Sequence, residues 1–170
     1  MSNRVAATDL IAEELKRIRQ SVPGVRGSIA ATSDGLLIAD DVHDMEPTQI
    51  AALVAALHAV AVRATLSTES GDFKDVITRA SEGYLAVFAA GSTAIVAVLG
   101  TTGLNVAILN YQARSMIERV AEVSGDLARR PQSDPAHAGP AHAGPAHAEP
   151  AHPEVADDDE GALPLRRRRR

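Results

Sequence analysis

Side chains able to bind a metal ion are concentrated between residues 40 and 46. The segment holds Asp40, Asp41, His43, Asp44 and Glu46. Carboxylate oxygens and imidazole nitrogens are metal ligands, but their spacing here differs from the Asp/Asn–Gly–Glu order of a calcium loop. Acidic residues also stabilise the positive end of a helix, and Pro47 suits a first helical turn. We therefore expect this segment to lead into a helix, and we predict no metal and no cofactor.

The six histidines of the chain fall into two further groups besides His43. His58 stands alone among apolar residues; it could be a ligand or a pH switch, but such a histidine is more typical of a core or interface residue. The others recur every five residues in copies of Pro-Ala-His: His137, His142, His147 and His152. Their even spacing would allow metal binding, whereas a repeat-expanded linker requires no ligand. We favour the linker.

Common catalytic motifs are missing from the sequence. It contains no Gly-Lys-Ser/Thr phosphate loop, no GxGxxG, HExxH or GxSxG, and no cysteine nucleophile. The Ser33-Asp34-Gly35 segment has one glycine and no lysine, so it predicts a hairpin turn instead of a phosphate cradle. These features predict a protein that acts by contact and is not an enzyme.

Composition narrows the kind of partner. Aromatic residues make up 2% of the chain and its net charge is −5, which leaves little for base stacking or for binding a phosphate backbone, so no nucleic-acid partner is expected. The absence of cysteine suits a reducing compartment, and the start MSNRVAATDL has no apolar signal region. We therefore expect a cytoplasmic protein.

Hydropathy and turn signals predict eight elements between residues 9 and 127. Helices are expected over residues 9–21, 47–68 and 105–127, and strands over residues 25–32, 36–40, 73–80, 84–90 and 93–100. The charge-free stretch 83–113 is long enough to span a membrane, but glycine-containing turns divide it at strand-like intervals. Residues 1–8 are expected to be flexible. Residues 128–170 are expected to be a disordered Pro/Ala/His tail with an acidic cluster.

The tail ends in a run of five arginines: Arg166, Arg167, Arg168, Arg169 and Arg170. Such a run could contact anionic lipid, RNA or an acidic protein. Acidic residues at 157–160 partly neutralise it. At most a weak membrane or anionic contact is expected from this segment.

The predicted helix over residues 47–68 is apolar on all sides. Every side chain from Ile50 to Val62 except His58 is apolar, and a helix of this kind must be covered on all sides. One face, expected at Ile50, Val54, Leu57, Ala61 and Ala64, can cover a sheet. The opposite face should then contact a second copy of the chain. That face is expected to comprise Ala52, Ala55, Ala56, Ala59, Val62 and Leu66.

Between residues 9 and 127 the sequence resembles the bacterial form of the roadblock/dynein light-chain family. The resemblance is carried by Val22–Gly27, the Ser33–Gly35 turn, the alanine-rich helix from Gln49, Gly83–Val87 and Ala94–Gly100. It implies a profilin-like α/β three-layer sandwich with a five-stranded antiparallel sheet in the order 2-1-5-4-3. It also implies a homodimer in which the second helices pack together and the third strands pair, which adds Phe73 and Val76 to the expected interface.

The same resemblance implies partnership with a small Ras-like GTPase, sometimes as its activating protein, in operons linked to sensor kinases. We therefore expect a non-catalytic homodimeric regulator. Two alternatives remain open. One is a signalling scaffold without effect on GTP hydrolysis, and the other is a small-ligand sensor.

Overall fold

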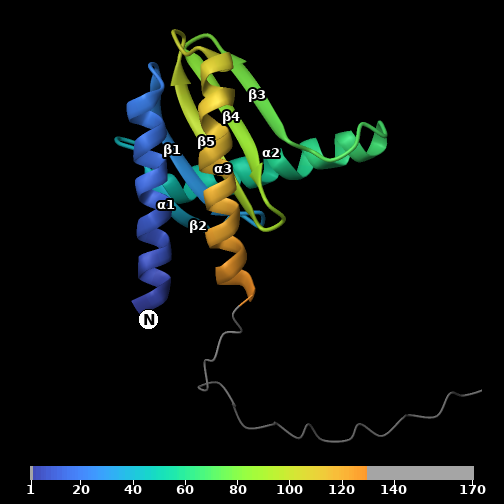
Figure 1. The fold of residues 1–170 in the computed structure, drawn as a ribbon. Helices are drawn as coiled ribbons and strands as arrows, with labels where there is room; N and C mark the ends of the chain where they lie inside the picture. Colours follow the sequence, from blue (N-terminus) through green and yellow to red (C-terminus); the bar gives the residue numbers. More distant parts are fainter. Residues whose placement is uncertain (1, 130–170) are drawn as a thin grey trace, which may run out of the picture. The chain divides into compact units, whose positions relative to one another are not determined.

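The computed structural model describes residues 2–129 (Figure 1). Five antiparallel strands form its sheet: β1 (Val25–Thr32), β2 (Leu37–Asp41), β3 (Asp75–Ala80), β4 (Gly83–Ala90) and β5 (Ala94–Thr101). Their order is β2-β1-β5-β4-β3, so the predicted fold class and strand order are confirmed. The stretch considered as a membrane span instead forms β4, β5 and the first residues of the last helix.

Three helices cover the sheet. They are α1 (Ser2–Ser21), α2 (Pro47–Ser67) and α3 (Val106–Arg129). Figure 1 shows α1 and α3 side by side on one face and α2 on the other. The central strands are apolar on both faces because each face has its own core: Val96 and Val98 pack toward α1 and α3, whereas Ile95 and Ala97 pack toward α2.

Two helix ends differ from the prediction. α1 begins at Ser2, so residues 2–8 belong to the helix and the expected start at Asp9 is wrong. Those residues include Ala6 and Ala7 and contain neither proline nor glycine, so nothing in them stops the helix. α3 continues to Arg129 instead of stopping at Leu127. The rest of the predicted tail, including its histidines and its arginine run, lies outside the described residues.

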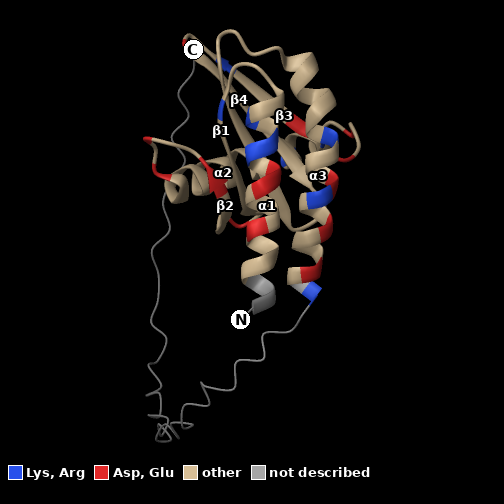
Figure 2. Ribbon diagram, turned by 60° about the vertical axis from the view of Figure 1, so that its left-hand side comes forward, with Lys and Arg blue, Asp and Glu red and all other residues tan. Residues whose placement is uncertain are grey.

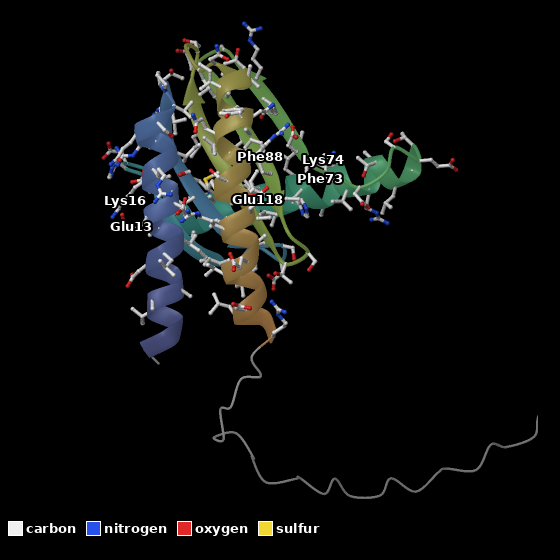
Figure 3. All side chains as sticks on the ribbon, viewed as in Figure 1. Glu13, Lys16, Phe73, Lys74, Phe88 and Glu118 are labelled. Carbon is white, nitrogen blue, oxygen red and sulfur yellow. The ribbon has the colours of Figure 1, made fainter. Side chains whose placement is uncertain are left out.

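Ion pairs between charged side chains link α1 to the end of β2 and to α3 (Figure 2). Arg19 holds Asp41 at the end of β2 with two bonds, one of them 3.0 Å from Nη2 to Oδ1. Glu14 is nearly buried and accepts from Arg17 on its own helix and from Arg119 on α3, at 3.0 Å. By contrast, Glu13 and Lys16 pair on the outer surface of α1 (Figure 3), where such a pair adds little stability.

Asn105 caps α3, as the sequence predicts. Its side-chain oxygen accepts from the backbone amides of Ala107 at 3.0 Å and Ile108 at 3.2 Å. Replacing Asn105 with alanine leaves both amides without this acceptor and should lower the free energy of unfolding by about 1 kcal/mol. Urea denaturation of this variant beside Asn110→Ala, an exposed position within α3, checks the expectation. Equal losses in the two variants would show that the cap contributes nothing.

Candidate functional site

The candidate site is formed by α2 and by the edge of the sheet at β3. Three residues of α2 are buried against the sheet: Ala51, Val54 and Ala55. The β1–β2 turn packs on the same helix, where Gly35 has a φ of +93° and a Cβ would lie 3.4 Å from the side chain of Ala55. A glycine here permits both the positive φ and the close approach. The first half of α2 is thereby fixed in its orientation.

Outside its contact with the sheet, α2 is exposed and mostly apolar, although Arg63 is among its exposed side chains. Its large exposed apolar side chains are Leu53, Val60 and Leu66, with exposed fractions of 65%, 67% and 69%. Between them lie the small exposed residues Ala52, Ala56 and Ala59. We call these six residues the open face of α2. A row of apolar side chains with alanines between them offers a partner helix both apolar area and room for close approach.

The second half of α2 extends past the sheet. Figure 1 shows the helix passing beneath β3 and projecting beyond it. In agreement, Arg63, Ala64 and Leu66 are exposed, whereas the buried residues of α2 lie at its start. The projecting half therefore has little of its own protomer to cover it.

β3 forms one end of the sheet. It pairs with β4 through all six of its residues, from Asp75 opposite Phe88 to Ala80 opposite Gly83. Within residues 2–129, no strand pairs with its other edge. An edge strand presents unpaired backbone donors and acceptors, which another strand can bind. The free edge of β3 lies where α2 passes beyond the sheet (Figure 1).

His58 and Phe73 meet where α2 passes this edge. Their rings are edge to face, with centroids 5.1 Å apart and planes inclined by 76°. Both side chains are partly buried. Burial lowers the pKa of His58, because the charged imidazolium loses hydration. The ring is thus kept in its neutral form within the apolar surroundings of α2.

The structure corrects the predicted orientation of α2. Ala55, expected to face away from the sheet, is 7% exposed and packs against it, while Ala64, expected to face the sheet, is exposed. Leu53 and Val60 belong to the open face and were not predicted. Of the other expected interface residues, four are exposed: Ala52, Ala56, Ala59 and Leu66. Three are partly buried: Val62, Phe73 and Val76.

The length of α2 and its mean hydropathy of 1.8 would also fit a helix that crosses a membrane. Core helices of globular domains can have the same length and hydropathy. Here Ala51 and Val54 are buried against the sheet of their own domain, and Arg63 lies within the helix. α2 is thus docked on the sheet of its own domain.

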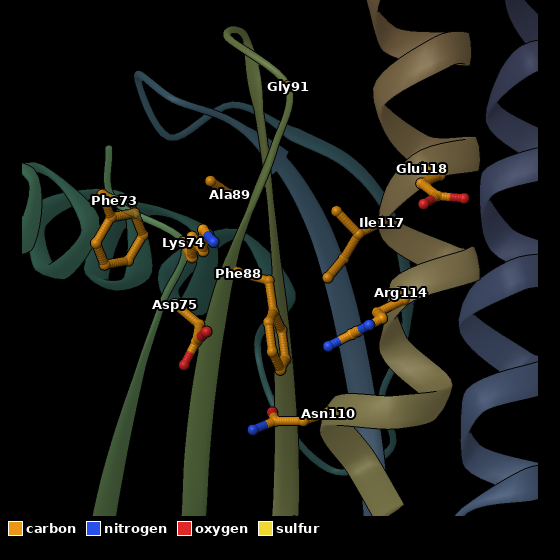
Figure 4. A pocket seen from close by; sticks show the side chains of 10 residues that line it. All are labelled: Phe73, Lys74, Asp75, Phe88, Ala89, Gly91, Asn110, Arg114, Ile117 and Glu118. Atoms are coloured by element: carbon orange, nitrogen blue, oxygen red, sulfur yellow. The ribbon is translucent and has the colours of Figure 1, made fainter. Parts of the chain in front are cut away.

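A cavity lies between β4, the start of β3 and α3, and Phe73, whose ring contacts His58, is part of its lining (Figure 4). It measures about 640 Å³. Phe88 and Ile117 add to its apolar part, and its charged groups are Lys74, Asp75, Arg114 and Glu118. In Figure 4, Arg114 and Ile117 point from α3 toward the strands. The cavity has neither histidine nor serine in its lining, and its charges are mixed in sign.

The acidic segment before α2 is not gathered into a ligand set. Asp41 is occupied by Arg19, while His43, Asp44 and Glu46 are exposed. No group of three or more histidine or carboxylate side chains in the described part of the chain is placed to hold a metal ion. Glu46 precedes α2 but makes no side-chain bond to its amides.

Solved structures share this fold. A Roadblock/LC7 domain from Streptomyces avermitilis is 24% identical, with a TM-score of 0.60 over 69% of this chain and 97% of its own. The gliding protein MglB from Thermus thermophilus is 16% identical, with a TM-score of 0.63 over 71% and 93%. MglB from Myxococcus xanthus is 13% identical, with a TM-score of 0.65 over 72% and 93%. No curated protein matches the chain.

A family model assigns the domain more directly. The model of the Roadblock/LC7 domain matches residues 11–100, which is more than half of the chain. The matched segment contains α2 and β3, the two elements of the candidate site, together with the whole five-stranded sheet except Thr101. The chain therefore belongs to the Roadblock/LC7 domain family.

Proposed function

We propose that this chain is a cytoplasmic homodimer that regulates a small Ras-like GTPase and catalyses no reaction itself. The observation that carries the proposal is the open face of α2, whose three large apolar side chains are each about two-thirds exposed in the protomer. Exposing such a row to water costs free energy, which a partner surface would recover. The resemblance to the bacterial roadblock proteins supports a second copy as that partner.

A two-fold axis beside β3 accounts for both parts of the site. Rotation about this axis places β3 of the two protomers side by side in antiparallel fashion, which joins their two sheets. The half of α2 that projects beyond β3 then lies over the partner's sheet (Figure 1). Ala52, Ala56 and Ala59 give the two helices room to approach. One contact thus covers the apolar face and the free strand edge together.

The proposed partner of the dimer is a small GTPase of the Ras type. Family membership supports this assignment, since members of this family are typically regulators without catalytic activity. Low intrinsic turnover in such GTPases arises largely from poorly positioned catalytic groups. A protein that fixes the switch segments of the GTPase can accelerate hydrolysis without contributing a catalytic side chain. The dimer would act in this way.

The test is GTP hydrolysis by a bacterial Ras-like GTPase, measured with and without the full chain. Binding to the GTP-loaded form is measured in parallel by calorimetry. We expect tight binding to the GTP form and faster hydrolysis. Binding without a change in hydrolysis would favour a signalling scaffold. Absence of binding to either nucleotide form would overturn the GTPase assignment altogether.

A further inference from the structure

His58 is the one titratable residue in the apolar first two-thirds of α2, and it lies among apolar side chains. The side chains one helical turn away from it on either side are Val54, Ala55, Ala61 and Val62. All four are apolar and at least partly buried. Across from the helix its ring meets Phe73. A positive charge on the partly buried His58 would therefore lie in surroundings that solvate it less well than water does.

Charged groups are present around this position, but none is bound to it. On α2 the nearest is Arg63; on the segment that leads into β3 they are Asp72, Lys74 and Asp75. All four side chains are exposed. Among residues 2–129, no carboxylate forms an ion pair with His58. The imidazolium form thus has no partner that would compensate for its burial.

The place of the ring is as important as its surroundings. His58 lies on the sheet-facing side of α2, one helical turn from Val54 and Ala55, where its ring contacts Phe73 just before the edge strand β3. In the dimer proposed above, α2 continues from this point over the partner's sheet, so two-fold symmetry would bring two such rings to the contact. Dimerisation would then remove more water from each ring than folding alone does.

We propose that His58 makes dimerisation of this chain sensitive to pH, so that protonation of its imidazole dissociates the dimer. This inference rests on the proposed homodimer. The sign follows from the preference of the buried ring for its neutral form. Burial already lowers the pKa of His58 in the protomer, so association is strongest above that lowered pKa, where the ring is neutral in both states, and weakens as the pH falls below it. A weaker dimer would release its GTPase partner.

The size of the effect follows from the number of protons. Two protons must be lost on association when both rings are protonated in the monomer. Between pH 7.5 and pH 5.5 the dissociation constant of the dimer should therefore rise roughly ten- to a hundredfold. Sedimentation equilibrium of the full chain at the two pH values measures it, with circular dichroism to verify that the protomer stays folded.

Three variants separate His58 from other titrating groups. His58→Gln removes the titration, and His58→Phe does so while keeping an aromatic ring against Phe73. Both should give dimers whose dissociation constant is the same at the two pH values. His43→Gln, at the exposed histidine before α2, is the matched control and should retain the full pH effect. Any contribution from Asp72 or Asp75 would persist in the His58 variants.

Each outcome is decisive. Wild-type dimers of equal affinity at pH 7.5 and pH 5.5 would overturn the proposed role of His58 and leave the homodimer standing. The same would follow from His58→Gln and His58→Phe dimers that still weaken at low pH. A protein that is monomeric already at pH 7.5 would overturn the homodimer, and with it the switch.

Discussion

Replacing Leu53 with aspartate should convert the dimer to monomers while the protomer stays folded. Leu53 lies on the open face of α2 and is 65% exposed, so its replacement removes little contact within the protomer. In the dimer, the new carboxylate would be buried without a partner against apolar side chains, which costs several kcal/mol. We expect the dissociation constant to rise more than a hundredfold, and Val60→Asp should act in the same way. Sedimentation velocity across a concentration series measures both.

The matched control is Tyr111→Asp. Tyr111 is 75% exposed and lies on α3, on the opposite side of the sheet from α2. This variant also places a carboxylate where a large exposed side chain stood, but outside the proposed contact. It should remain dimeric. Equal dissociation of the Leu53 and Tyr111 variants, or of neither, would show that the interface is not where we place it.

Val54→Asp should destabilise the protomer itself, whereas Leu53→Asp should dissociate the dimer. Val54 is almost completely buried between α2 and the sheet, so aspartate here forces an unpaired carboxylate into the core. The expected loss is about 4 kcal/mol or more in the free energy of unfolding, a large part of the stability of a domain of this size. Thermal unfolding followed by circular dichroism should show a lower transition temperature or no folded state.

Val54→Ala and Leu53→Asp complete this test. The alanine variant removes two methyl groups from the core and should stay folded with a moderate loss of stability. In Leu53→Asp, the unfolding of the protomer should be unaffected once the contribution of dimerisation is removed. A Val54→Asp protein as stable as Leu53→Asp would mean that the sheet-facing side of α2 is wrongly assigned.

The order of elements was predictable because its signals are local. Val96 and Val98 alternate with Ile95 and Ala97 in a strand that is buried on both faces, and glycine-containing turns mark where strands end. Asn105 marked the start of α3 for the same reason. Sequence order alone does not fix the pairing of strands, however. The order β2-β1-β5-β4-β3 came from the family resemblance, and the structure confirms it.

The orientation of α2 could not be predicted, because its pattern carries no phase. From Ile50 to Val62 apolar residues lie on all sides of the helix, so no charged side indicates which face meets solvent. The face toward the sheet is decided by the sheet and by the β1–β2 turn at Gly35, which packs on Ala55. Small alanines give no signal of their own, so Ala55 was assigned to the wrong side. The exposed positions of Leu53 and Val60 follow once that packing is known.

Ion pairs between residues far apart in the chain cannot be predicted from the sequence pattern either. The sequence shows Asp41 as one of a group of acidic residues before a helix, whereas in the structure it binds Arg19, 22 positions away. Glu14 is joined to Arg119 over 105 positions. Such partners are set by how α1 packs on the rest of the domain, and nothing in the local spacing of these residues indicates them.

The proposed homodimer is tested most directly by light scattering coupled to size-exclusion chromatography of the wild-type full chain at pH 7.5. We predict a mass twice the 17.8 kDa of the chain, and a mass near that of one chain for Leu53→Asp. A wild-type protein that elutes with the mass of one chain at concentrations of tens of micromolar would contradict the account. The open face of α2 would then need a different partner to cover it.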